Sequence, residues 1–449
     1  MRDIAIFLIV IASCVASLRK PYYGFLCWVW LSLMNPHRLA YGWVQNMPLA
    51  QWTVIFTLVG TFLYKEKAKL FQHPIVALQI LFVCWMATST VFAMFPEPAY
   101  FQFTKVVKIQ FGVLLSYVLI DSKEKINGLI VMMFMSVGFY GVKGGIHTLM
   151  HGGANKIWGP PGTFVEDNNA LALAILMAMP LGAYLITIAS NKLVKNSLLG
   201  ALGTMGVSVL GSSSRGAFLG LISVIIFWMR KANGKQKIMV FILAIFIGTV
   251  AAVFMPQQWW DRMNTVKTYE KDGSSMGRIN AWWCAYNAAK DNITGVGFDY
   301  YSPTAFAQYA PNPTDVHAAH SIYFQVLGEH GFLGFILFMI IAAWGWVVCG
   351  GIIHKTKNVE ILKWANDLAR MIQLSLIAYF SAGAFLSLAY YDLYWQLIGI
   401  AVILKTVVEK ALLKPATSML NERINPVNKA KSASPSFVRP TKSIPGNSS

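Results

Sequence analysis

Long apolar stretches separated by short polar connections constrain this chain more than any other feature of its sequence. A helix needs about 20 apolar residues to cross a bilayer, and stretches close to that length recur as far as Leu413. The chain is 56% hydrophobic and 12% charged, whereas soluble domains contain about 25% charged residues. The sequence therefore predicts an all-α, polytopic membrane protein of about 12 or 13 transmembrane helices. The expected spans cover residues 3–18, 22–34, 48–64, 73–95, 105–121, 126–150, 170–190, 197–211, 216–229, 238–255, 320–353, 370–390 and 393–412.

Basic residues predict the orientation of these helices. Cytoplasmic connections are enriched in Lys and Arg, and in this chain the basic clusters fall on alternate connections, at 19–20, 65–69, 123–125, 192–195, 230–237 and 355–363. If all of these lie inside, the outer face carries residues 35–47, 96–104, 151–169, 211–215, 256–319 and 390–392. The same distribution accounts for the net charge of +18 as a topology signal, and it argues against nucleic acid as a partner.

We divide the sequence into three regions. Residues 1–150 form an N-terminal transmembrane region, in which the first two stretches are short enough to be two helices or one re-entrant element. Residues 151–412 form a second transmembrane region that contains a large, partly helical outer loop at 256–319. Residues 413–449 are rich in Pro, Ser, Lys and Asn, which is typical of a disordered tail, here basic and cytoplasmic. The five cysteines have neither a disulfide framework nor zinc-site spacing.

Arg215 lies in the outer connection Gly-Ser-Ser-Ser-Arg-Gly at 211–216. Ser214 is a suitable N-cap, so Arg215 would stand on the first turn of the next helix. Free N–H groups and the helix dipole attract anions there, and arginine adds a bidentate fork for phosphate. The alternative is an interfacial arginine that snorkels to the surface. Because positive charge is disfavoured on the outer side, we interpret Arg215 as an anion-binding residue.

Arg278 lies near the start of a helix that the sequence predicts from about Ser274 to Lys290 within the large loop. Trp282 and Tyr286 follow at spacings of four, so the three side chains share one helix face. We expect this face to lie flat on the membrane, with the arginine above a lipid phosphate. The alternative is a structural ion pair between Arg278 and one of three nearby carboxylates, which are Asp261, Glu270 and Asp272.

His320 stands where the large loop re-enters the membrane. A neutral imidazole near pH 7 is a competent general base, although a histidine at a helix start is more often a cap or an interface residue. Two arginines on the same face favour the catalytic interpretation. His317, three residues earlier, is expected to share a helix face with His320. Glu329 would point to the opposite side of an ideal helix, so we interpret it as a buried structural carboxylate.

Two further features are weaker candidates. The run from Trp158 to Asn169 predicts a Pro-Gly turn followed by an N-cap, or a polar rim for sugar hydroxyls formed by Glu166, Asp167 and Asn168. Two adjacent carboxylates alone are weak grounds for a metal site, so no metal is expected. Lys143 lies within an apolar stretch, where ionisable residues are functional candidates. It is a candidate third phosphate contact.

The motifs resemble a known superfamily, the bacterial O-antigen ligases and O-antigen polymerases. The shared motifs are Ser214–Gly216, Gly277–Arg278, Gly295–Phe298, His320–Ser321 and Gly328–Gly334. The superfamily usually has asparagine after the histidine, and Ser321 departs from that pattern. A closer resemblance, to O-glycosylation ligases associated with exosortase A systems, covers nearly the whole chain through Met1–Ile4, Met34–Arg38, Gly141–Gly145, Trp158–Asn169 and Met276–Trp283.

This resemblance implies an inverting glycosyl transfer without metal, nucleotide or cofactor at the periplasmic face of the bacterial inner membrane. The donor would be an undecaprenyl-diphosphate-linked glycan, and the acceptor an exported protein or a lipid-anchored saccharide. Arg215 and Arg278, with Lys143, would bind the diphosphate, and His320 would act as the general base. The residues expected at the rim for the glycan or acceptor are Glu166, Asp167, Asn168, His317 and Trp282.

Two other functions remain open at this stage. A polymerase that extends one lipid-linked glycan with another would use the same donor, and sequence does not separate it from a ligase. A transporter of lipid-linked sugar would need polar groups at mid-membrane and on both faces. The chain lacks the inverted internal repeat that marks secondary transporters, and most of its candidate residues gather on the outer side.

Overall fold

The computed structural model describes residues 1–64, 73–231, 234–264 and 273–424, and all regular secondary structure in these ranges is helical. The helices at the expected spans are α1 (Arg2–Arg19), α2 (Pro21–Leu33), α3 (Leu49–Leu63), α4 (Pro74–Val91), α5 (Pro96–Leu119), α6 (Lys123–Met150), α7 (Asn168–Ile188), α8 (Lys192–Gly211), α9 (Arg215–Lys231), α10 (Gly234–Phe254), α14 (Ile322–Thr356), α15 (Lys363–Gly383) and α16 (Asp392–Ile424). The outer loop contributes α11 (Gln257–Asn264), α12 (Gly273–Asp291) and α13 (Pro303–Tyr309). The predicted all-α class is confirmed.

Six helices among the described residues are long and apolar enough to cross a membrane, namely α4, α6, α7, α8, α10 and α14. The protein is therefore a multi-pass membrane protein. The two short N-terminal stretches form separate helices, because the chain leaves helical geometry at Lys20 between α1 and α2. At the other end, α16 continues past Leu413 to Ile424, so the start of the expected disordered tail is helical. Residues 425–449 lie outside the described residues.

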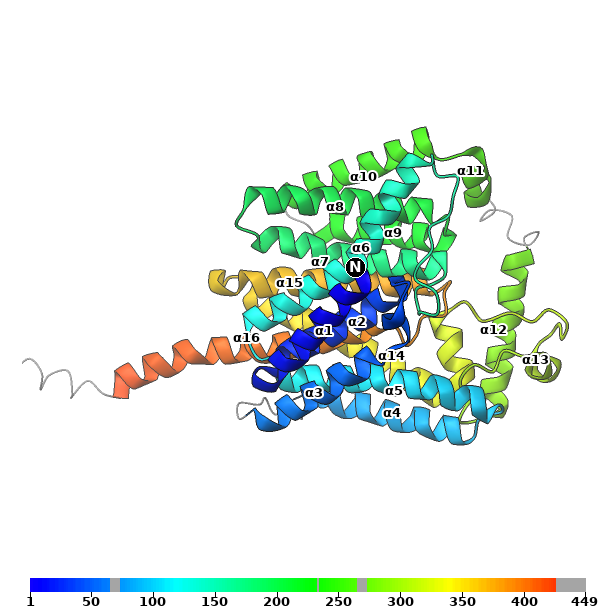
Figure 1. Ribbon diagram of the computed structural model, residues 1–449, viewed down its shortest axis with the longest axis horizontal. Coiled ribbons are helices and arrows are strands. Elements are labelled where there is room, and N and C mark those ends of the chain that lie inside the picture. Colours follow the sequence, from blue (N-terminus) through cyan, green and yellow to red (C-terminus); the bar gives the residue numbers. More distant parts are fainter. Residues whose placement is uncertain (65–72, 232–233, 265–272, 425–449) are drawn as a thin grey trace, which may run out of the picture.

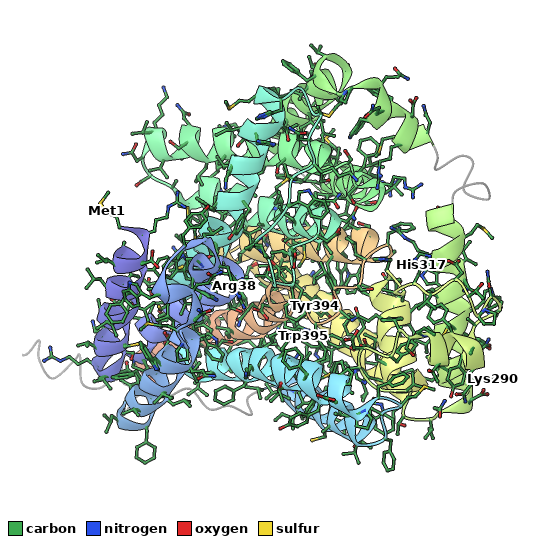
Figure 2. The ribbon with its side chains drawn as sticks, turned by 45° about the vertical axis from the view of Figure 1, so that its right-hand side comes forward. Met1, Arg38, Lys290, His317, Tyr394 and Trp395 are labelled. Carbon is green, nitrogen blue, oxygen red and sulfur yellow. The ribbon has the colours of Figure 1, made fainter. Side chains whose placement is uncertain are left out.

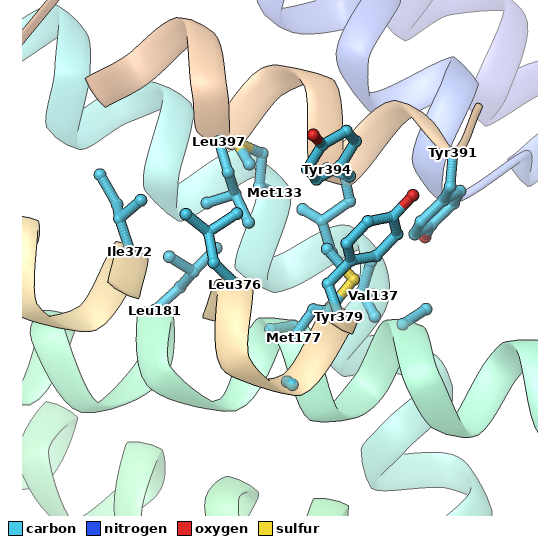
Figure 3. Packing of buried hydrophobic residues seen from close by; sticks show 14 of the residues in the cluster. Met133, Val137, Met177, Leu181, Ile372, Leu376, Tyr379, Tyr391, Tyr394 and Leu397 are labelled. Carbon is cyan, nitrogen blue, oxygen red and sulfur yellow. The ribbon is translucent and has the colours of Figure 1, made fainter. Parts of the chain in front are cut away.

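The core of the membrane region is built around α7 and α15. Helix α7 is rich in Ala, Leu and Met, and 83% of its apolar window is buried. Figure 3 shows Met177 and Leu181 of this helix facing Leu376 of α15. Tyr379 of α15 stacks on Tyr394 of α16, with ring centroids 4.2 Å apart. Helices α6 and α16 complete this core, so it joins elements from both halves of the sequence.

Close packing of α6 on α8 explains the glycine motif at 141–145. A Cβ atom at Gly145 would lie 1.9 Å from the carbonyl oxygen of Thr204, and one at Gly141 would lie 2.7 Å from the Met205 side chain. Small residues let transmembrane helices approach in this way. The motif therefore has a packing role.

Several basic connections that were predicted to lie inside meet at one end of the molecule. Tyr22 at the start of α2 donates to the carbonyl of Lys125 in α6 (2.7 Å), and the Lys123 ammonium lies 5.4 Å from the ring centre of Trp364 in α15. Figure 1 shows α12 and α13 at the right-hand end and the C-terminal half of α16 extending from the opposite end. This arrangement agrees with the predicted alternation of inner and outer connections.

Helix α14 is interrupted, which the continuous apolar stretch did not predict. Gly331 has φ 66° and ψ −174°, which is not helical. The carbonyls freed by the break accept backbone bonds from the outer loop, from Val296 to Gly328 and from Gly297 to Glu329, both at 3.0 Å. A broken helix is tolerated within a membrane only where such partners exist. The two glycine motifs that carried the family resemblance, at 295–298 and 328–334, are therefore parts of one junction.

Candidate functional site

Arg215 is placed by a tight hairpin between α8 and α9. Ser213 adopts the left-handed conformation (φ 53°), and the Ser214 hydroxyl accepts a hydrogen bond from the Ala217 amide at 3.2 Å. This is the N-cap that the sequence predicted. Arg215 consequently stands at the first residue of α9, partly buried, at a helix end that favours anions.

Three side chains from two other outer elements, α7 and α11, hold this hairpin by its carbonyl groups. Asn168 at the start of α7 donates to Ser212 O at 2.6 Å. On α11, Arg262 donates through Nε to Ser213 O at 2.9 Å, and Trp259 donates through Nε1 to Leu210 O at 2.9 Å. The sequence did not assign Arg262 this role, because nothing in its spacing indicates which carbonyl it reaches.

The loop before α7 has the turn and cap that its sequence predicted. The Glu166 carboxylate accepts from the Gly162 amide at 2.7 Å, and Asp167 accepts from the amides of Asn169 and Ala170 at 2.9 and 3.3 Å. Both carboxylates thus support the backbone. Within the part of the chain that the structure describes, no three His, Cys, Asp or Glu side chains group in a way that could hold a metal ion.

Helix α12 is fastened to the loop that leads to His320. Asn280 donates to the carbonyls of Asn312 and Asp315 at 2.8 and 3.0 Å and accepts from the Asn312 amide at 2.9 Å. Trp282 donates through its indole N–H to Ala319 O at 2.7 Å and stacks on Phe324 with ring centroids 5.0 Å apart. These contacts hold Arg278 beside the His320 loop.

The expectation that this face of α12 lies flat on a membrane stays a prediction: its aromatic members contact protein, but Tyr286 is also 41% exposed. Trp282 is engaged with Phe324 of α14, and the Tyr286 ring contacts Phe332 of the same helix. The face was predicted from its four-residue spacing, which does not reveal whether lipid or protein covers it. Of the alternative ion-pair partners of Arg278, Asp261 accepts a hydrogen bond from Gln257 (3.0 Å), and Glu270 and Asp272 lie outside the described residues.

His317 and His320 do not share a helix face, contrary to expectation. Helix α14 begins only at Ile322, and His320 has a left-handed backbone with φ 43°, a region in which His is enriched. The His317 imidazole Nε2 lies 2.8 Å from an Asp315 carboxylate oxygen, and its ring lies against Gly277, where a Cβ atom would be 2.4 Å from it. Figure 2 shows His317 at one end of α12 and Lys290 at the other.

The surroundings of His320 favour the neutral imidazole. Partial burial lowers its pKa below the ordinary value of 6.5, and the nearby positive charge of Arg278 lowers the pKa further. Asp167 acts in the opposite direction and His317 adds a smaller lowering effect. His320 lies outside the membrane spans, and at pH 7 it is a neutral base next to a guanidinium group. The structure thus brings Arg278, Asp167 and His317 around His320, while Asn168 connects them to the Arg215 hairpin.

Lys143 lies elsewhere. It is exposed on α6 and lines an apolar groove between α1, α2, α6 and α8. That groove shares no lining residue with a second hollow, a cavity of about 710 Å³ that includes Glu166 and Ala318 and therefore adjoins the site. Lys143 is not part of the group around His320.

The family comparisons fall on two parts of the chain. Residues 1–189 match a family of unknown function (DUF5935). Residues 200–339 match the O-antigen ligase family. The O-antigen ligase region starts in α8, ends within α14 and contains Arg215, Arg278 and His320. No curated protein matches the chain. The resemblance to O-antigen ligases is confirmed over this region, and the narrower resemblance to exosortase-associated ligases stays a prediction.

Glu329 lies within this O-antigen ligase region and was expected to be a buried carboxylate apart from His320. It is 2% exposed and accepts hydrogen bonds from the Tyr390 hydroxyl at 2.5 Å and the Asp299 amide at 3.4 Å. The sequence did not indicate that Glu329 also lines the cavity beside the site. The position of Glu329 on its helix predicts only the direction of its side chain. The cavity also needs residues of α16, which are distant in the sequence.

Proposed function

We propose that the protein is a glycan ligase that transfers a glycan from an undecaprenyl-diphosphate-linked donor to an acceptor hydroxyl at the periplasmic face of the bacterial inner membrane. The observation that carries this proposal is the placement of His320 beside Arg278, outside the membrane spans and within the region that matches O-antigen ligases. The donor and the location follow from the family resemblance, which also supplies the acceptor classes, an exported protein or a lipid-anchored saccharide.

The chemistry divides between the base and the two arginines. His320 takes the proton from the acceptor hydroxyl, whose oxygen then bonds to the anomeric carbon as the bond from that carbon to the diphosphate breaks. Arg215 and Arg278 neutralise the charge that develops on the leaving diphosphate. Arginine stays charged at every physiological pH and matches phosphate geometry, so the scheme needs no metal. Attack from the side opposite the leaving group inverts the anomeric configuration.

The rim residues support this arrangement in different ways. The negative charge of Asp167 raises the pKa of His320. Asn168 stabilises the Arg215 hairpin through its hydrogen bond to Ser212 O. Trp282 positions the backbone before His320. Exposed His317 and Glu166 are placed to meet the glycan or the acceptor as it approaches.

Transfer in proteoliposomes from the native lipid-linked donor tests this proposal. Arg215→Ala, Arg278→Ala and His320→Ala should each abolish transfer, and wild-type activity should survive EDTA and the absence of nucleotide. Two matched controls are Arg230→Ala and His354→Ala, which replace exposed residues away from the site and should leave transfer unchanged. Lys143→Ala should cost far less activity than either arginine variant.

Different outcomes would favour different functions. Full activity in purified, folded Arg278→Ala and His320→Ala would contradict the proposed mechanism. A ladder of repeated additions would identify a polymerase that uses the same site, whereas a single addition identifies a ligase. Movement of glycolipid across the bilayer without a covalent product, unchanged by His320→Ala, would point to a transporter.

A further inference from the structure

A cavity of about 710 Å³ opens beside the candidate site. Its wall is formed by α2, α5, α14 and the start of α16, together with the outer segments around Asn35, Glu166 and Tyr301. Ala318, two residues before His320, also lines it. Its volume falls within the range of about 300–1,000 Å³ that is common for ligand sites.

Three side chains at the start of α16 line this cavity, and each has a buried polar atom without a partner among the described residues. Asp392, Gln396 and Tyr391 are 7%, 6% and 3% exposed and line the cavity. Among the described residues, Asp392 Oδ1, Gln396 Oε1 and the Tyr391 hydroxyl have no hydrogen-bond partner. The other carboxylate oxygen of Asp392 accepts from the Ser32 hydroxyl.

Such atoms are rare, because about 90% or more of buried polar groups in proteins have a hydrogen-bond partner. A carboxylate oxygen and an amide oxygen accept hydrogen bonds, and a phenol hydroxyl both donates and accepts. Three of them on one wall of a cavity are suited to a ligand with several hydroxyl groups.

The remaining wall of the cavity indicates which kind of hydroxylated ligand fits. The aromatic side chains of Trp28, Tyr301 and Tyr390 line it, so it offers apolar surfaces beside the polar atoms. Glu329 and Asp392 are acidic and buried in the wall, and Lys105 and Lys108 of α5 also line it, so the wall carries charges of both signs. A sugar has both hydroxyl groups and apolar C–H faces, which match the polar atoms and the aromatic side chains of this wall.

We propose that this cavity binds the saccharide part of a substrate and orients it toward His320. The proposal deepens the proposed function and rests on it, because the lining residue Ala318 lies two residues before the proposed base. The saccharide comes from the lipid-linked donor or from a saccharide acceptor, and the cavity chemistry is the same for both.

The test compares two tyrosines that lie close together in the sequence. The Tyr391 and Tyr394 hydroxyls are both buried and lack partners among the described residues, but only Tyr391 lines the cavity. Figure 3 shows both rings, with Tyr394 beside Tyr379. Tyr391→Phe should raise the KM of one substrate about 2- to 10-fold, and Asp392→Asn about 10- to 150-fold. Tyr394→Phe should leave both KM values within about twofold of wild type.

Separate titrations of donor and acceptor identify the source of the sugar. A higher KM for the donor alone assigns the cavity to the donor glycan, and a higher KM for the acceptor alone assigns it to the acceptor. If Tyr391→Phe and Asp392→Asn, both folded, match Tyr394→Phe for both substrates, the proposal is overturned.

A binding measurement separates this proposal from the proposed function. Equilibrium dialysis of purified protein would use the glycan released from its lipid by mild acid, and in a second arm the acceptor saccharide. Binding of either probe that is weakened by Asp392→Asn and kept by His320→Ala supports the cavity assignment, even if transfer proves independent of His320. Absence of binding in wild type for both probes, together with unchanged KM values, would refute it.

Discussion

Replacing Trp282 with phenylalanine tests whether α12 positions the proposed base. The indole N–H of Trp282 donates to Ala319 O, and Ala319 is fully buried. Phenylalanine keeps an aromatic ring against Phe324 but removes the donor. A buried carbonyl left without its partner costs about 1–3 kcal/mol. If the same free energy is lost from the activation step because His320 is misplaced, kcat should decrease about 5- to 150-fold.

The assay is the initial rate of glycan transfer in proteoliposomes, with kcat and the donor KM measured separately. Because the change acts on the base and not on the diphosphate, kcat should fall while the donor KM stays near the wild-type value. Trp283→Phe is the matched control, since Trp283 is 53% exposed and its ring contacts only Tyr286 among the described aromatic residues. Equal kcat values for folded Trp282→Phe and Trp283→Phe would refute the argument that this bond positions His320.

Three further predictions follow from contacts around the site and the junction. Gly277→Ala should lower activity, because the new Cβ would lie 2.4 Å from the neighbouring imidazole; transfer rates would show this, and an unchanged rate would contradict it. Activity should fall as pH drops through the lowered pKa of His320. Asp167→Asn removes a carboxylate that raises this pKa, so it should move the acidic limb of the kcat/KM profile to lower pH. An acidic limb that does not move, or that moves to higher pH, would count against His320 as the base. Gly331→Ala should destabilise the fold by about 1–3 kcal/mol or more, because the backbone conformation of Gly331 is accessible essentially only to glycine. Gly351→Ala on the same helix is the control, since a Cβ atom there would meet no atom within 4 Å. Similar thermal unfolding of the two variants in detergent would contradict this prediction.

The sequence predicted the features that depend on local patterns. Apolar stretches of bilayer length predicted the positions of the helices, and the cap at Ser214 followed from residue type alone. Alternating basic connections placed the segments containing Arg215, Arg278 and His320 on the same side. These predictions succeeded because each depends on a short segment or on its charge.

The features that failed depend on contacts between distant segments. His320 has a left-handed backbone, and the residue before it, Ala319, accepts a hydrogen bond from Trp282. The break in α14 at Gly331 lies where the loop at 295–297 donates backbone hydrogen bonds to this helix. The wall of the cavity combines residues of α2 with polar residues of α16, two helices that are far apart in the sequence. No periodicity within one segment contains this information, so local propensity was overridden by tertiary packing.

The junction between the outer loop and α14 has a mechanical consequence. Backbone hydrogen bonds from Val296 and Gly297 cross to the break in α14, while Trp282 ties the same loop to the start of that helix. A swing of α12 and α13 away from the membrane would have to break the backbone bonds that join the loop to the broken transmembrane helix. The described part of the loop therefore belongs to the same cooperative unit as α14, and a lipid-linked substrate would meet a preassembled site instead of one that closes over it.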